Sequence, residues 1–207
     1  MTIRVLLADD ENLIREALGQ MLGLEDDLEV VAQAASGDEA LAVALKVEPD
    51  VAVLDLQMPA RGGRGLDGIE VAEELGVRLP SCVCVVVTSH GRPGHLKRAL
   101  AVGVRGFLPK TTSAATLADV IRRVHDGGRH VDPELAAEAI SAGDSPLTPR
   151  EADVLELAAD GAPVEEIARR ASLSPGTVRN YLSSAVTKLG AANRHDACAT
   201  ARRLGWI

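Results

Sequence analysis

Acidic, hydroxyl and basic side chains follow the ends of four short apolar runs in the first half of the sequence. These side chains are Asp9, Asp10, Asp55, Thr88 and Lys110. The carboxyl ends of parallel strands meet at one edge of an open α/β sheet. If the apolar runs are strands of such a sheet, we expect all five side chains to lie together at that edge.

The chemistry that such a group supports is phosphoryl transfer to a carboxylate. Three neighbouring carboxylates raise one another's pKa unless a cation balances them, and oxygen ligands without Cys or His favour Mg²⁺. Lys110 and Thr88 offer an ammonium and a hydroxyl to a phosphate, which leaves Asp55 as the nucleophile. A lone Asp at a strand end is usually a cap and a lone Lys is usually solvated, so the prediction depends on all five together.

The elements that would hold these residues alternate between two hydrophobic periods. Nearly continuous apolar runs predict strands buried on both faces, and they are Ile3–Ala8, Leu28–Ala34, Val51–Leu54, Cys82–Thr88 and Val104–Leu108. Helical spacing of apolar residues lies between and after them, as in Leu117, Val120, Ile121 and Val124. Five strands alternating with five helices predict an α/β fold with right-handed crossovers and a doubly wound, five-stranded parallel sheet over residues 1–125.

The second half of the chain loses its strand signals. We expect a linker over residues 126–146 with a short helix near 133–142, followed by an all-α domain over residues 147–207. Thr148 and Glu151 have the spacing of a capping box. Ser174 and Pro175 have the types preferred at an N-cap and at the first position of a helix. The segment therefore predicts a helix, a tight turn and a second helix.

The charge of this second domain indicates nucleic acid. The chain has a net charge of −8, but residues 168–207 hold seven Arg or Lys against one Asp, a net of +6, so the remainder carries −14. The polar face of the helix that starts near Ser174 holds no acidic residue. Its candidate DNA-contacting residues are Thr177, Arg179, Asn180, Ser183 and Lys188. Arg and Asn suit guanine and adenine edges, whereas Ser, Thr and Lys suit phosphates.

Residues 1–125 resemble the receiver domain of two-component systems. The resemblance lies in Asp9-Asp10, Asp55 in Asp-Leu-Gln-Met-Pro, Thr88, and Lys110 at the end of Gly-Phe-Leu-Pro-Lys. It implies a flavodoxin-like strand order 2-1-3-4-5 and a phospho-acceptor at Asp55. It also implies Mg²⁺ bound by Asp9, Asp10, Asp55 and the backbone carbonyl of Gln57. In this family Thr88 and the aromatic residue at Phe107 form a switch, although Phe107 is open to a second interpretation as plain core.

Residues 147–207 resemble the four-helix LuxR-type helix-turn-helix domain. With the receiver, the chain is similar to the NarL/FixJ class of response regulators, and most similar to its actinobacterial DesR-like branch. The resemblance implies base contacts by Arg179, Asn180 and Ser183, and phosphate contacts by Thr177 and Lys188.

The function implied is that of a phosphorylation-controlled transcription regulator. A sensor histidine kinase would supply the phosphoryl group, and the protein would pair into a homodimer through residues 91–102, 104–108 and 113–126 and bind promoter DNA. RNA polymerase is a further candidate partner. We expect no enzymatic activity beyond the protein's own phosphorylation and dephosphorylation. We also expect no membrane span, a cytoplasmic location, and reduced, buried Cys82, Cys84 and Cys198.

The sequence departs from the receiver pattern in one segment, which has two interpretations. The family usually runs from Met-Pro to Asp-Gly within a few residues, whereas here Ala60–Leu66 intervenes. This segment is either a plain surface loop or one whose Arg61 or Arg64 alters dephosphorylation or kinase choice.

The whole chain has two alternative functions. One is a haloacid-dehalogenase-like phosphatase, whose nucleophile follows the first strand, and the other is a regulator that works without phosphorylation.

Overall fold

The computed structural model describes residues 2–58, 65–89, 92–141 and 143–207. The chain forms two compact units, Met1–Gly91 with Lys97–Pro133 and Arg92–Leu96 with Glu134–Ile207. Within the described ranges no helix is both long and apolar enough to cross a membrane. Cys82, Cys84 and Cys198 are buried and free of disulfides.

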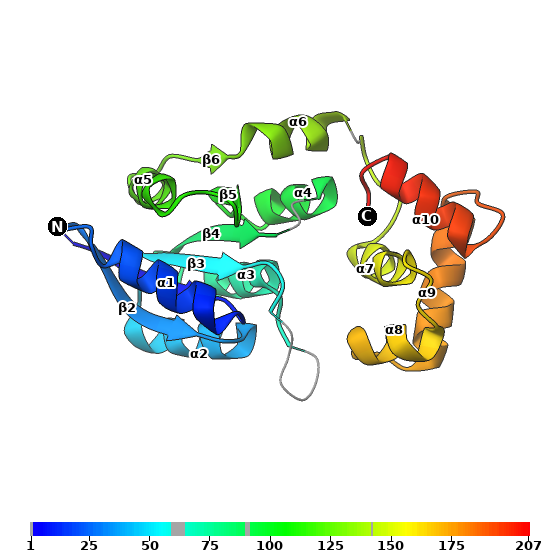
Figure 1. Ribbon diagram of the computed structural model, residues 1–207, viewed down its shortest axis with the longest axis horizontal. Coiled ribbons are helices and arrows are strands. Elements are labelled where there is room, and N and C mark those ends of the chain that lie inside the picture. Colours follow the sequence, from blue (N-terminus) through cyan, green and yellow to red (C-terminus); the bar gives the residue numbers. More distant parts are fainter. Residues whose placement is uncertain (1, 59–64, 90–91, 142) are drawn as a thin grey trace. The chain divides into compact units, whose positions relative to one another are not determined.

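The first unit is built on one parallel sheet, as predicted (Figure 1). Its strands are β1 (Ile3–Ala8), β2 (Leu28–Ala34), β3 (Val51–Asp55), β4 (Val83–Thr88), β5 (Gly106–Pro109) and β6 (His130–Val131). The strand order is β2-β1-β3-β4-β5-β6, and every neighbouring pair is parallel. The predicted order 2-1-3-4-5 is therefore confirmed for the first five strands.

The predicted number of strands is wrong by one. β6 lies in the segment that the sequence assigned to the linker, and it pairs Gly106 with His130 and Phe107 with Val131. Two residues are too short to show strand periodicity, so no pattern could indicate them. Gly127, with φ +89°, turns the chain back toward β5 in a conformation that favours glycine.

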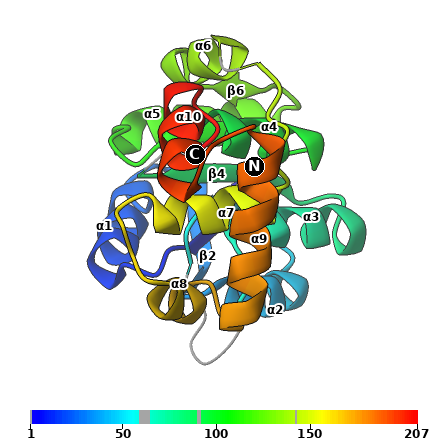
Figure 2. The same ribbon diagram turned by 90° about the vertical axis from the view of Figure 1, so that its right-hand side faces the viewer.

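Helices cover both faces of the sheet. They are α1 (Asn12–Leu22), α2 (Gly37–Val47), α3 (Gly68–Arg78), α4 (Pro93–Ala101) and α5 (Ala114–His125). Val5, Val53 and Val85 share a buried cluster with side chains of α1 and α5. Since side chains alternate across a strand, Leu6 and Leu54 point to the opposite face, and Figure 2 shows α2, α3 and α4 on that side.

Strand register sets which residues share the functional edge of the sheet. Ala8 lies opposite Leu54, Asp55 opposite Val87, and Thr88 opposite Pro109. The residues directly after these positions therefore leave the sheet at nearly the same level, as the Asp9, Asp55 and Lys110 prediction requires.

The second unit is helical. Its helices are α6 (Pro133–Ser141), α7 (Pro149–Ala158), α8 (Val164–Arg170), α9 (Pro175–Lys188) and α10 (Arg194–Arg203). Thr148 and Glu151 form the predicted capping box, and Ser174 caps α9 through the Thr177 backbone N–H. α7 to α10 enclose one apolar core around Leu155, Ile167 and Val178. The predicted four-helix domain is confirmed.

Gly68 offers a test of how α3 is joined to the functional edge. A Cβ added there would lie 2.2 Å from the Asp55 carbonyl oxygen, whereas one at Gly76 of the same helix would meet its nearest neighbour at 3.9 Å. We expect Gly68→Ala to lower the free energy of unfolding by about 2 kcal/mol. Gly76→Ala should leave stability unchanged or raise it by up to about 1 kcal/mol. Urea unfolding followed by circular dichroism checks both, and equal effects would contradict this account of α3.

Candidate functional site

Three carboxylates converge at the carboxyl ends of β1 and β3. Oxygen atoms of Asp9, Asp10 and Asp55 all lie within 4.8 Å of one another. Asp9 and Asp55 are each only 3% exposed, whereas Asp10 is exposed to solvent. The structure thus brings together the acidic residues that the sequence predicted, with an open side at Asp10.

Lys110 supplies positive charge to this acidic group. Its Nζ lies 2.9 Å from Asp9 Oδ2, 3.0 Å from Asp55 Oδ2 and 3.0 Å from Glu11 Oε1. Burial disfavours the charged ammonium, but the contacts with the three carboxylates outweigh it and raise the pKa of Lys110. The side chain is therefore a fixed cation at neutral pH.

Asp55 is the carboxyl group that burial perturbs. Burial and the neighbouring charge of Asp9 raise its pKa, while Lys110 and the Gln57 backbone N–H lower it, and the balance raises the pKa of Asp55 to about 6. The group is therefore mainly a carboxylate at neutral pH, and it lies in a setting poor in water. A partly desolvated carboxylate beside an ammonium is suited to act as a nucleophile toward a phosphoryl group.

The group fits a divalent cation. Asp9 Oδ1 accepts a hydrogen bond of 2.8 Å from the Glu11 backbone N–H. Asp9 Oδ2 is buried and, among the described residues, accepts no hydrogen bond of normal geometry, although Lys110 lies within ion-pair distance. A buried carboxylate oxygen facing two further carboxylates is the kind of donor that Mg²⁺ takes.

The predicted switch residues Thr88 and Phe107 lie on β4 and β5, the two strands that follow β3 in the sheet. Thr88 is 1% exposed at the end of β4, and Phe107 is fully buried in β5, where it pairs with Val86. The Gln57 backbone N–H donates to Asp55 Oδ1 at 3.3 Å, which places Gln57 directly beside the acceptor carboxylate. Gln57 thus contacts Asp55, Thr88 follows its strand partner Val87, and Phe107 lies one strand further along the sheet. The switch and metal-binding roles of these residues remain predictions.

Glu11 is a member of this group that the sequence reasoning missed. It occupies the N-cap position of α1, yet its side chain does not cap the helix and contacts Lys110 instead. Its side chain is 56% exposed, so it is the most accessible of the three Lys110 partners. Its position directly after Asp9-Asp10 was the signal that could have indicated it.

Arg98 forms a second contact that the sequence did not reveal. From α4 it donates to Asp67 Oδ2 at 2.7 Å and to Asp67 Oδ1 at 3.4 Å. Asp67 also caps α3 in a capping box with Glu70. One carboxylate therefore connects the start of α3 to α4. Residues 59–64 of the lengthened loop, including Arg61 and Arg64, lie outside the described residues.

The polar face of α9 is exposed, as predicted. Arg179, Asn180, Ser183 and Lys188 are exposed, while Thr177 is half-buried and its hydroxyl hydrogen-bonds to that of Ser174 at 2.8 Å. The opposite face packs Val178, Leu182 and Ala185 into the domain core. α9 thus presents amide, hydroxyl and guanidinium groups on one side, the groups that contact bases and phosphates in a DNA groove.

Lys188 has a partner within the domain. Glu151 in α7 is 4% exposed and accepts from Lys188 Nζ at 2.7 Å, from Ser184 Oγ at 2.6 Å and from the Thr148 backbone N–H at 2.7 Å. One buried carboxylate therefore fixes α9 against the start of α7. The phosphate contact predicted for Lys188 remains a prediction, since its ammonium already binds this carboxylate.

Comparison with known families decides the identity of both units. Residues 5–122 match the family "Response regulator receiver domain", and residues 145–201 match "Bacterial regulatory proteins, luxR family". The chain belongs to the response regulators. The predicted NarL/FixJ class is confirmed. The haloacid-dehalogenase alternative is not supported, because one match is to a receiver domain and the other to a family of bacterial regulatory proteins.

Relatives match this response regulator along its whole length. It is 41% identical to "Transcriptional regulatory protein DesR" of Bacillus subtilis over 205 residues, 99% of each chain. It is 38% identical to "Response regulator RamR" of Streptomyces coelicolor, covering 99% of this chain and 98% of the relative. The solved structure of RcsB from Salmonella enterica bound to promoter rprA covers 96% of this chain and 98% of its own, with 25% identity and a TM-score of 0.72.

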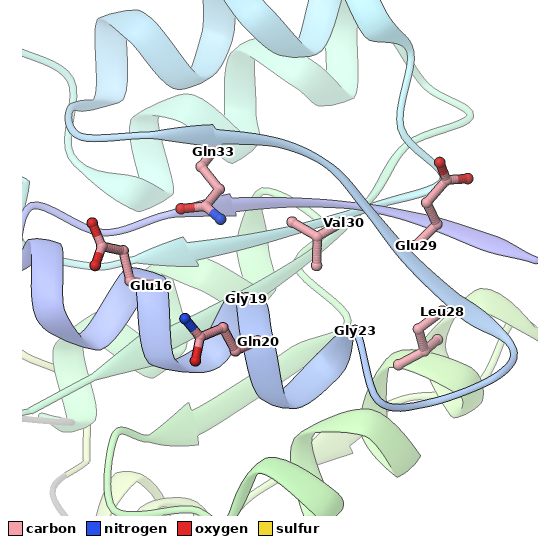
Figure 3. A pocket seen from close by; sticks show the side chains of 8 residues that line it. All are labelled: Glu16, Gly19, Gln20, Gly23, Leu28, Glu29, Val30 and Gln33. Carbon is pink, nitrogen blue, oxygen red and sulfur yellow. The ribbon is translucent and has the colours of Figure 1, made fainter.

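A shallow hollow of the response regulator lies apart from these groups. It runs between α1 and the edge strand β2 (Figure 3). Its lining consists of Glu16, Gly19, Gln20, Gly23, Leu28, Glu29, Val30 and Gln33. None of these eight residues belongs to the predicted sites.

The low pKa of Glu151 predicts that acid destabilises the DNA-binding domain. Burial works to raise its pKa, but the bonds from Lys188, Ser184 and Thr148 outweigh burial and lower the pKa of Glu151 to about 2 from an ordinary 4.5. The folded state therefore binds fewer protons than the unfolded state. This stabilisation is complete above pH 4.5, and on the order of 3 kcal/mol should be lost as the pH falls toward 2.

Fluorescence of the single Trp, Trp206, reports this measurement because that side chain packs against the core of the second unit. Urea unfolding between pH 6 and pH 2.5 should show a steeper loss of stability for the wild type than for Glu151→Gln, whose side chain cannot titrate. Equal pH dependence in the two proteins would show that Glu151 does not carry the effect.

Proposed function

We propose that this response regulator accepts a phosphoryl group on Asp55 from a sensor histidine kinase and then binds promoter DNA as a homodimer through α9. The observation that carries the proposal is the buried Asp55 carboxylate, held 3.0 Å from Lys110 Nζ and within 4.8 Å of Asp9 and Asp10. Carboxylate, ammonium and candidate metal ligands are the parts that phosphoryl transfer to an aspartate needs.

The proposed reaction is a displacement at phosphorus. An Asp55 carboxylate oxygen forms a bond to phosphorus while the bond from phosphorus to the donor breaks, and a phosphohistidine donor leaves as imidazole, which takes up a proton. Lys110 neutralises charge on the phosphoryl oxygens. Asp9, Asp10, Asp55 and the Gln57 carbonyl would hold Mg²⁺, which supplies further neutralisation of that charge when bound. The protein's own catalysis is limited to this transfer and the later hydrolysis.

The proposed signal starts at Thr88 and Phe107. A phosphoryl group on Asp55 adds about −1.5 to −2 charge units, and the Thr88 hydroxyl lies one strand away as a donor to it. Because β4 and β5 are paired in register, with Val86 opposite Phe107 and Thr88 opposite Pro109, a shift of β4 at Thr88 would reach Phe107 on β5. The surface formed by α4, β5 and α5 would then pair two molecules.

The proposed DNA contacts lie on α9. Arg179, Asn180 and Ser183 would contact base edges in the major groove, and Thr177 and Lys188 would contact phosphates. A single module of this kind buries only about 600–1,000 Å² on DNA, which favours a dimer on two half-sites. Because the target is promoter DNA, we place the protein in the cytoplasm, with RNA polymerase as a further partner.

Phosphorylation is testable on the intact protein. With Mg²⁺ and acetyl phosphate, the wild type should gain one phosphoryl group in intact mass spectrometry and shift toward the dimer in light scattering. Asp55→Asn should do neither, because the amide is a poor nucleophile. Asp38→Asn, which removes an exposed carboxylate of α2, should behave as the wild type. A phosphoryl group on Asp55→Asn would assign the acceptor to another residue.

Arg179→Ala tests the DNA contact. Loss of a bidentate guanine contact costs about 1–3 kcal/mol, so affinity for a site selected from a random DNA pool should fall about 5- to 150-fold. Arg203→Ala in α10 removes the same charge from another exposed position and should weaken binding much less. Fluorescence anisotropy measures both, and equal losses would mean that Arg179 acts only through its charge.

A further inference from the structure

Arg179, the proposed base-contacting residue of α9, has an acidic neighbour on α8. Arg179 Nη2 lies 3.5 Å from Glu165 Oε1, and the two side chains are 61% and 64% exposed. Figure 2 shows α8 beside the start of α9, and the two helices pack against each other within the same unit. An acidic side chain thus lies at the edge of a face that otherwise presents groups suited to an anion.

The adjacent acid, Glu166, makes a different contact. Both residues lie in the first turn of α8, where a negative charge stabilises the helix, and Pro163 provides no side-chain cap there. Glu166 pairs with Arg170 at 3.9 Å, one turn along its own helix. Glu165 instead reaches α9. Helix stabilisation accounts for both acids equally, so it does not explain why Glu165 contacts Arg179.

The geometry of the pair leaves Arg179 able to bind a base. A guanidinium carries five N–H donors in a planar fork, and the contact with Glu165 is made through Nη2. One Nη2 hydrogen can stay on Glu165 while the other, together with a hydrogen of Nη1, forms a bidentate contact with guanine O6 and N7. Phosphates lie along the DNA backbone and not at the base edges. To contact a phosphate, the exposed Arg179 side chain would have to break its contact with Glu165.

We propose that Glu165 is a specificity-determining, positioning residue that acts through Arg179. It orients the guanidinium toward a guanine edge and opposes its use as a general phosphate contact. The Glu165 carboxylate stabilises the complex with a specific site, because Arg179 keeps its contact with Glu165 there. On unrelated DNA Arg179 must break this contact to reach a phosphate, and the unpaired Glu165 carboxylate then faces the negatively charged backbone, which destabilises that complex. This inference rests on the proposed function, in which Arg179 contacts a base.

Glu165→Gln and its matched control Glu166→Gln test the proposal in the full-length protein. Each removes one negative charge from the same turn of α8, but only the first lies beside Arg179. Affinities are measured for a site selected from a random DNA pool and for a scrambled duplex of the same composition. Glu165→Gln should lower the ratio of the two affinities about fivefold, chiefly through tighter binding to scrambled DNA. Glu166→Gln should raise both affinities alike and leave the ratio unchanged.

Repeating both substitutions in the Arg179→Ala background separates the inference from the function on which it rests. Without the guanidinium, Glu165→Gln should have no larger effect than Glu166→Gln. If Arg179→Ala weakens the selected site but the two Gln variants behave alike in the wild-type background, the role of Glu165 is overturned and the base contact stands. If Arg179→Ala leaves the affinity for the selected site unchanged, both the base contact of Arg179 and the role of Glu165 are overturned. Unchanged Trp206-monitored unfolding shows that no variant acts through stability.

Discussion

Five charged side chains meet where the strands of the receiver end, and Lys110 is the cation among the carboxylates of Asp9, Asp10, Glu11 and Asp55. Its ammonium lies within 3.0 Å of Asp9, Glu11 and Asp55, which allows two of these carboxylates to be almost fully buried. Removing one partner of a buried charge group is costly, so the other charges depend on Lys110 remaining in place. β3, β4 and β5 are held in register by backbone pairing, and that register sets the spacing of Asp55, Thr88 and Lys110. A phosphoryl group on Asp55 would enter a part of the receiver where charge, burial and strand register are already coupled.

The DNA-binding domain also contains a buried carboxylate that is compensated by a lysine. Glu151 is almost fully buried and is compensated by Lys188, Ser184 and the Thr148 backbone N–H. Since Ser184 and Lys188 are one turn apart on α9, this carboxylate fixes both the position and the rotation of the helix. The opposite end of α9 carries Arg179, whose exposed pairing with Glu165 is weak enough to change when DNA binds. A rigid end and an adjustable end thus occur on one helix.

Much of the receiver could be predicted because its signals are local and periodic. Apolar runs define the strands, and a parallel sheet must bring the carboxyl ends of its strands together. The convergence of Asp9, Asp10, Asp55 and Lys110 therefore followed from their positions after these runs in the sequence. Glu11 directly follows Asp9-Asp10, which could have placed it at this edge of the sheet, but its contact with Lys110 spans 99 positions of the chain and is seen in the fold alone. The Glu151–Lys188 and Glu165–Arg179 pairs also join different helices, and no spacing rule within one helix indicates them. β6 was missed because two residues carry no period.

The central claim is that chemistry at Asp55 changes binding at α9. The most direct measurement is the affinity of the full-length protein for a DNA site that it selected from a random pool, with Mg²⁺, before and after treatment with acetyl phosphate. The account predicts an affinity gain of about tenfold or more for the wild type, and none for Asp55→Asn. Equal affinity for that site before and after verified phosphorylation of the wild type would contradict it, and would favour a regulator that works without phosphorylation.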